Sequence, residues 1–129
     1  MSSEEEPTEK KEEKKSSKRR NKEKSGKLHE SLKDIKARAG VIGYILRSSD
    51  SASIDLKDPT KIIDYAVLSS TALEAGEDLS KTFELGEIQN VLLEGKDAKI
   101  LSLKVEDQRL SIFMERTVSH EKIHKDLNI

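Results

Sequence analysis

The chain has 129 residues, nearly balances 24 Lys and Arg against 25 Asp and Glu, and contains no cysteine. This length suits one domain with a tail, and a net charge of −1 gives no strong field that would indicate a nucleic-acid partner. Without cysteine, the chain cannot form a disulfide framework or a thiolate metal site. The acidic N-terminus lacks the apolar core of a signal peptide, and no apolar run approaches the ~20 residues of a membrane span. We therefore expect a cytoplasmic protein without a membrane span.

The first 26 residues contain no Ile, Leu, Val, Phe, Tyr or Trp. A segment with so few apolar side chains cannot offset the entropy that is lost when it orders. We therefore predict a disordered charged tail over residues 1–26 and a folded domain over residues 27–129. The basic residues from Lys18 to Lys24 suggest an arm for an anionic partner, but the mixed sign of the tail favours a solubilising role.

The folded part begins with apolar residues from Leu28 to Ala39 at the spacing of an amphipathic helix, which Gly40 is expected to end. A short apolar run over residues 41–46 predicts a strand. Serines and an aspartate then predict a turn, and residues 53–56 predict a short returning strand.

A long apolar helix is predicted next. Asp58 is suited to cap its first N–H groups, and Pro59 at the first helical position has no N–H that would lack a partner. Between Ile62 and Leu73 the only charged residue is Asp64. A surface helix on a small domain normally has one apolar stripe, so this helix needs burial on two sides. The glycine and charges over residues 76–81 place its end there.

Three strands and a short helix complete the predicted order. The strands cover residues 88–94, 99–105 and 109–115, with tight turns between them, and Ser119 is expected to cap the final helix. Hairpins imply antiparallel pairing. The predicted fold class is therefore α+β, with a single five-stranded antiparallel sheet flanked by helices.

This element order resembles the roadblock/light-chain-7 family of small-GTPase regulators and dynein-associated light chains. The resemblance runs from about Leu28 to the C-terminus. It is carried by Gly40-Val41-Ile42-Gly43, by the long helix with its Ala and Ser residues, and by the segment from Gly86 to Gly95. The chain departs from the family at Asp50, which Ser51 follows where the family often has glycine, so a looser first hairpin is expected.

The resemblance implies a non-catalytic homodimer without a cofactor, whose partners are a second copy and a Ras-like small GTPase. In the family the long helices of two subunits pack antiparallel, and the strands that follow them pair across the dimer axis. Small residues three or four positions apart along one side of the long helix would let a second helix approach. We expect the interface to contain Ile62, Tyr65, Ala66, Ser69, Ala72, Leu73, Gly76, Ile88 and Val91.

One motif indicates a different function. The segment from His120 to His124 matches H-E-x-x-H, the zinc-protease signature, in which Glu121 would act as general base. A third ligand is needed, and the five residues that follow offer none at the correct spacing. We therefore expect Ile123 to pack inward with Leu127, while His120, Glu121 and His124 face water. His120 and His124 remain weak metal candidates only.

The resemblance therefore implies an adaptor that regulates or scaffolds a small Ras-like GTPase. The alternatives are a structural subunit of a larger complex without GTPase contact, and a metal-dependent hydrolase built on the histidine motif. We expect no nucleic-acid partner, because none of the four aromatic residues is interleaved with the basic segment.

Overall fold

The computed structural model describes residues 26–127. The chain divides into two compact units, with the boundary after Asp34. In the first unit residues 26–34 are helical, and this helix ends at Lys36 in the second unit. The predicted charged tail over residues 1–26 lies outside the described residues except for Gly26.

The first helix is shorter than the sequence predicts. It ends four residues before Gly40, and Ala39 is exposed in a turn. Two backbone hydrogen bonds of tight turns form in place of further helix, from Arg38 N to Ile35 O at 3.1 Å and from Val41 N to Arg38 O at 3.3 Å. Successive bonds of this type commonly tighten a helix end, and here they lead the chain into the first strand.

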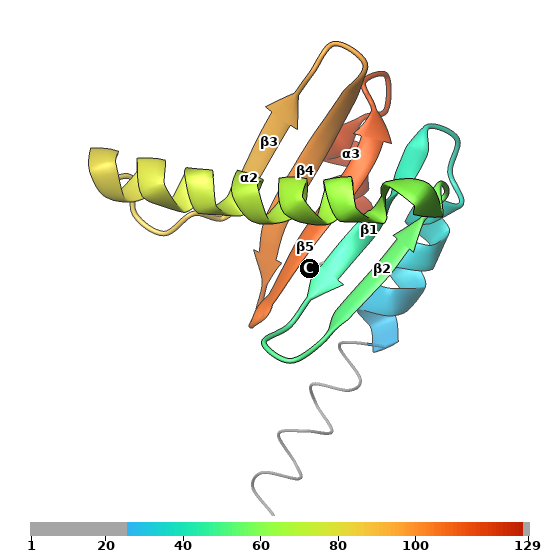
Figure 1. Ribbon diagram of the computed structural model, residues 1–129, viewed down its shortest axis with the longest axis horizontal. Helices are drawn as coiled ribbons and strands as arrows, with labels where there is room; N and C mark the ends of the chain where they lie inside the picture. Colours follow the sequence, from blue (N-terminus) through green and yellow to red (C-terminus); the bar gives the residue numbers. More distant parts are fainter. Residues whose placement is uncertain (1–25, 128–129) are drawn as a thin grey trace, which may run out of the picture. The chain divides into compact units, whose positions relative to one another are not determined.

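The second unit is a five-stranded sheet with α2 on one face and α3 on the other (Figure 1). No helix among residues 26–127 is long and apolar enough to cross a membrane. The elements in chain order are β1 (Val41–Arg47), β2 (Ala52–Leu56), the 3-10 turn η1 (Pro59–Lys61), α2 (Ile62–Phe83), β3 (Asn90–Glu94), β4 (Ala98–Val105), β5 (Gln108–Glu115) and α3 (His120–Asp126).

The strands lie in the order β2-β1-β5-β4-β3, and every neighbouring pair is antiparallel. This confirms the predicted α+β class with its hairpin and three-stranded meander. Gly43 allows the first hairpin to close tightly, because a Cβ at this position would lie 2.3 Å from the carbonyl oxygen of Asp55. Its φ of +154° is also one that side-chain-bearing residues rarely adopt.

Helix α2 and strand β3 differ from their predicted bounds. The helix continues past Gly76 to Phe83, and β3 begins at Asn90 rather than at residue 88. Glu84 ends α2 in the left-handed conformation with φ 55°, and the Leu85 N–H bonds to the Ser80 carbonyl at 3.0 Å. This is the hydrogen-bond pattern of a Schellman-type helix end. The helix therefore ends by its cap geometry and not at its glycine.

The apolar core beneath α2 joins the helix to the sheet. The rings of Tyr65 on α2 and Phe113 on β5 lie 4.5 Å apart, tilted by 52°, a favourable geometry for aromatic pairs. On the other face of the sheet, α3 buries Ile123, and Leu127 just after the helix is also buried. The cluster beneath α2 consists of Ile45, Leu56, Ile100 and Phe113, with Ile42, Tyr65 and Ala66 packed against it.

Candidate interaction surface on helix α2

Asp58 caps the 3-10 turn η1 that leads into helix α2, and not α2 itself. Asp58 Oδ1 accepts a hydrogen bond from Thr60 N at 3.1 Å and another from Thr60 Oγ1 at 2.5 Å. These hydrogen bonds lower the pKa of the Asp58 carboxyl below its ordinary value. Pro59 opens a single 3-10 turn, and the α-helix proper starts at Ile62. The cap therefore fixes the point at which the chain crosses onto the face of the sheet.

The side of α2 that faces the sheet is built from small residues. Gly76 gives the closest approach, because a Cβ there would lie 2.5 Å from Val91 Cγ2 on β3. Such contact requires the helix backbone to lie almost directly on the strand, which a larger side chain would prevent. The residues of α2 that are buried are Ser69, Ala72, Leu73, Gly76 and Ser80.

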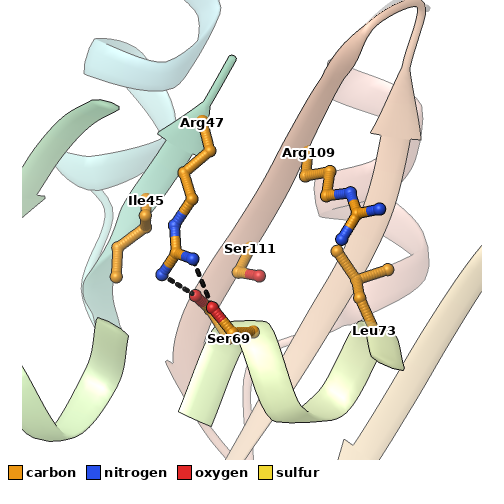
Figure 2. A pocket seen from close by; sticks show the side chains of 7 residues that line it. Ile45, Arg47, Ser69, Leu73, Arg109 and Ser111 are labelled. Carbon is orange, nitrogen blue, oxygen red and sulfur yellow. Dashed lines mark hydrogen bonds between the residues drawn. The ribbon is translucent and has the colours of Figure 1, made fainter. Parts of the chain in front are cut away.

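A second anchor of α2 is polar. Arg47, at the end of β1, reaches across to the helix and donates from Nη2 to the carbonyl oxygen of Ala66 at 2.7 Å and to Ser69 Oγ at 3.1 Å. Its Nη1 donates to Ser70 Oγ. Figure 2 shows this guanidinium lying over the Ser69 side chain, in the hollow between the helix and the sheet. The arginine thus binds the middle of α2 to an inner strand.

Glu77 makes a third contact between α2 and the sheet. Its Oε1 lies 3.2 Å from Lys104 Nζ on β4 and 3.5 Å from Arg109 Nη2 on β5. The hydrogen bond from Lys104, followed by the positive charges around it, lowers the pKa of the Glu77 carboxyl, although burial acts in the opposite direction. The carboxylate is therefore the favoured form at neutral pH.

Away from the sheet, α2 carries large apolar side chains that no other segment of residues 26–127 covers. Ile63 is 77% exposed, Val67 62%, Leu79 56% and Phe83 66%. These four residues stand at intervals that are multiples of four and follow one ridge, which turns by about 40° per step, so that Val67 and Leu79 point away from the sheet while Ile63 and Phe83 lie toward its two flanks. Thr71 and Ala75 occupy the two intermediate positions, and both are exposed. We call these six residues the exposed ridge.

The C-terminal part of the exposed ridge lies beyond the sheet. Helix α2 crosses the strands and extends past the edge strand β3 (Figure 1). Because Gly76 already contacts Val91 on that edge strand, Leu79 and Phe83 follow after the point where the sheet ends. Leu85 and Leu93, near the same end, are 68% and 44% exposed. Large apolar side chains that gather on one surface are typical of a protein interaction site.

The predicted interface residues divide between the two sides of the helix, and most of them lie inside the chain. Ser69, Ala72, Leu73 and Gly76 are buried beneath α2, so the sheet of the same chain occupies the position where we expected a second helix. Tyr65 and Ala66 are half-buried against the apolar core, and Ile88 and Val91 are half-buried near Gly76. Of the predicted residues, only Ile62 is exposed.

This placement corrects the small-residue argument. Small residues at intervals of three and four do mark a close approach of two elements, but the element approached here is β3. The exposed ridge was missed. The sequence nevertheless shows that its six residues, which are spaced four apart from position 63 to position 83, are all uncharged. Arg47 and Glu77 were missed as well, because single charged residues carry no spacing signal.

The histidine motif lies on α3. Ser119 caps this helix by accepting a hydrogen bond from Lys122 N at 3.2 Å, and Ile123 and Leu127 are buried as predicted. Glu121 and His124 are exposed. His120 is half-buried, and its Nδ1 lies 3.2 Å from the Nζ of Lys99, a cation that would compete with a metal ion. Within residues 26–127, no three His, Asp or Glu side chains gather in a group that could hold a metal ion.

The comparison with solved structures identifies the fold. The chain superposes on the crystal structure of a Roadblock/LC7 domain from Streptomyces avermitilis with a TM-score of 0.63 and 16% identity, covering 76% of this chain and 86% of that one. The chain has a roadblock-like fold. No protein-family model and no curated protein matches it. The roadblock-like fold thus rests on the arrangement of its elements and not on sequence identity.

Proposed function

We propose that this roadblock-like chain is a non-catalytic homodimeric adaptor that regulates or scaffolds a small Ras-like GTPase. The observation that carries the proposal is the exposed ridge of α2, where four large apolar side chains are each more than half exposed. Full burial of such a side chain contributes about 1.5–3 kcal/mol. This gain is available only if a partner covers the ridge.

The exposed ridge is complementary to itself in an antiparallel pair of helices. Ile63 and Phe83 lie ten positions on either side of Leu73, and Val67 and Leu79 lie six positions on either side. A two-fold axis at the level of Leu73 therefore places Val67 of one copy at the height of Leu79 of the other, and Ile63 at the height of Phe83. Closest to the axis are Thr71 and Ala75, whose small side chains let the two helices approach. Self-complementarity is what a two-fold dimer requires.

Strand β3 offers a second surface at which two copies could meet, in an arrangement different from the face-to-face packing of the ridge. It is an edge strand of the sheet, and an edge offers unpaired backbone groups to another strand. Leu93 on this strand is 44% exposed. As the resemblance to the roadblock family implies, pairing of two β3 edges would instead join the two sheets into one with both α2 helices on the same face, and the overhanging ends of α2 would then lie over the partner's sheet.

The dimer is tested by the mass of the full chain in solution. We expect light scattering to give twice the 14.5 kDa mass of the chain, and Val67→Asp to give a monomer, because an unpaired charge buried in an apolar interface costs several kcal/mol. Val67 is 62% exposed in the single chain, so circular dichroism should remain unchanged. Lys81→Gln changes the net charge equally and should remain dimeric. A monomeric wild-type chain would overturn the dimer.

A mixing experiment tests the proposed register. If Val67 of one copy faces Leu79 of the other, Val67→Asp and Leu79→Lys each place charges against an apolar side chain in their own homodimers. A mixture of the two forms one Asp–Lys pair and keeps one Val–Leu pair in every heterodimer. We expect heterodimers to form from chains that are monomeric alone, and their absence would contradict this register.

The GTPase is tested separately with the immobilised chain. Lysates are loaded with a non-hydrolysable GTP analogue or with GDP, and the recovered small GTPases are identified by mass spectrometry. Recovery that depends on the nucleotide and is lost with Val67→Asp supports regulation by the dimer. Recovery that is indifferent to the nucleotide supports scaffolding. Recovery of other subunits without a GTPase contradicts the GTPase part of the proposal but leaves the dimer intact.

A further inference from the structure

Three basic side chains stand next to one another across three strands. In the register of the sheet, Arg47 on β1 is opposite Arg109 on β5, and Arg109 is opposite Lys104 on β4. Like charges at directly opposed positions destabilise a sheet. This row of cations therefore favours the presence of negative charge close by.

Glu77 supplies part of that charge. It contacts Lys104 and Arg109 at 3.2 and 3.5 Å. Three cations and one carboxylate leave these four side chains with a net charge of +2. Arg47 is the member of the row farthest from Glu77 in the strand order, because β5 lies between β1 and β4.

The hydrogen bonds of Arg47 go to uncharged acceptors. These are the carbonyl oxygen of Ala66 and the hydroxyl oxygens of Ser69 and Ser70. A guanidinium has five N–H donors, and these contacts use three. No contact described for residues 26–127 uses the Nε–H or the second Nη1–H of Arg47, so these two donors are available to a ligand. These two N–H groups lie on different edges of the guanidinium and do not form a fork, so each can donate a single charge-assisted hydrogen bond to an oxyanion.

The two arginines line one hollow between α2 and the sheet. Figure 2 shows Arg47 and Arg109 extending from neighbouring strands toward the helix, with Ser111 between them. The enclosed part of the hollow is only large enough for a water-sized group, and its outer part is open to solvent. It can thus accept the terminal oxygens of an anionic group but not a large ligand. It is lined by Ile45, Arg47, Ser69, Ser70, Leu73, Arg109 and Ser111.

We infer that this hollow is a binding site for a phosphate group, held by Arg47 and Arg109 at its mouth and by the hydroxyl of Ser70. The charge decides between oxyanions. A phosphate monoester carries about −1.5 to −2 at neutral pH, which matches the +2 of the four side chains, whereas a carboxylate would neutralise only half of it. The phosphate comes either from the free ion or from a phosphate monoester.

The site lies on a different side of α2 from the exposed ridge. Ser69, Leu73 and Glu77 follow one row at intervals of four, and this row is offset by two residues from Val67, Thr71 and the rest of the ridge. Two residues correspond to about 200° around an α-helix. A second copy seated on the ridge therefore leaves the hollow open, and phosphate binding does not depend on the proposed dimer.

The test is a titration of the full chain at pH 7 and constant ionic strength, followed by amide chemical shifts in NMR. We expect inorganic phosphate to cause saturable shifts at Arg47, Ser69, Ser70 and Arg109. Arg47→Gln and Arg109→Gln should each weaken binding about tenfold or more, because a hydrogen bond to a charged group contributes about 1.5–3 kcal/mol. Arg47→Lys keeps the charge but has fewer N–H donors, so its affinity should be intermediate.

The control variant is Lys122→Gln, which removes an exposed cation on α3, on the far face of the sheet. It should bind phosphate like the wild type. If Arg47→Gln unfolds the chain, Arg109→Gln carries the comparison, because the contact of Arg109 with α2 described for residues 26–127 is an ion pair with Glu77 at 3.5 Å, which Glu77 also forms with Lys104. Equal shifts in Lys122→Gln and the arginine variants would show general screening and overturn the site.

Two further ligands test which kind of anion the proposed phosphate site prefers. Glycerol phosphate that competes with inorganic phosphate and binds more tightly supports recognition of a phosphate on a larger molecule. Tighter binding of inorganic phosphate supports the free ion. Acetate that binds as tightly as phosphate would overturn the assignment to phosphate.

Discussion

Gly76 of α2 and Val91 of β3 are in such close contact that a single added carbon would collide. A Cβ at position 76 would lie 2.5 Å from Val91 Cγ2. This contact sets the depth at which the helix lies on the sheet, because Val91 is β-branched and its rotamer is stiff. It also keeps a glycine in the interior of a helix of 22 residues.

We predict that Gly76→Ala destabilises the protein. Overpacking costs about 1–3 kcal/mol, whereas the better helix propensity of alanine returns only about 1 kcal/mol. Urea unfolding should give a lower free energy of unfolding for the variant. In a Val91→Ala background the obstructing Cγ2 is gone, and Gly76→Ala should become neutral or stabilising. A destabilisation of equal size in both backgrounds would show that the contact is not its cause.

A pair of buried serines allows a second prediction. Ser102 and Ser111 are opposite each other on β4 and β5, their hydroxyl oxygens are 2.8 Å apart, and both side chains are buried. Ser102→Ala should cost about 1–3 kcal/mol, because it leaves the Ser111 hydroxyl without its partner. The double variant Ser102→Ala/Ser111→Ala should be more stable than this single variant. Additive losses in urea unfolding would contradict the pairing.

The fold could be predicted from sequence because its signals are local. Capping residues Asp58 and Ser119 fix the starts of two helices, and the strands are apolar runs separated by turn residues. The end of α2 could not be predicted in the same way. Gly76 is a typical stop signal, but the helix continues because its backbone has to lie on Val91, a contact that only the tertiary structure brings about.

The interaction surface was only partly predictable for a related reason. The long apolar helix indicates burial on two sides, and the structure has both a sheet-facing side and an exposed ridge. The sequence does not say which side meets which neighbour, since small residues such as Ala72 suit a strand as well as a second helix. To predict the hollow between Arg47 and Arg109, one must know the register of β1 and β5, and no short sequence motif encodes that register.

The N-cap of η1, the turn that leads into α2, gives a third prediction. Asp58 accepts hydrogen bonds from both the N–H and the hydroxyl of Thr60. Asp58→Ala should lower the midpoint of thermal unfolding, because the first N–H groups lose their acceptor. Asp58→Asn keeps a side-chain oxygen and should lose less. Equal midpoints for the two variants would show that the cap oxygen is not what stabilises this turn.

The last prediction concerns pH. The hydrogen bond from Lys104 and the charge of Arg109 lower the pKa of Glu77 below its ordinary value of 4.5. A carboxyl whose pKa is lower in the folded state stabilises the fold above its unfolded pKa, and this stabilisation is lost as the pH falls through the folded value. We therefore expect the stability of the wild type to fall on acidification below about pH 5. Glu77→Gln should be less stable at pH 7, and the difference should narrow toward pH 3.

The same variant connects stability to the proposed phosphate site. Removal of the Glu77 charge raises the net charge around the hollow from +2 to +3, so Glu77→Gln should bind phosphate more tightly although it unfolds more easily. Glu94→Gln removes an exposed carboxylate on β3 and serves as the matched control. Parallel stability curves for Glu77→Gln and the wild type between pH 7 and pH 3 would refute the role of the ion pair. Weaker phosphate binding by Glu77→Gln would refute the electrostatic basis of the site, because a change that adds positive charge can only favour an anion held there by charge.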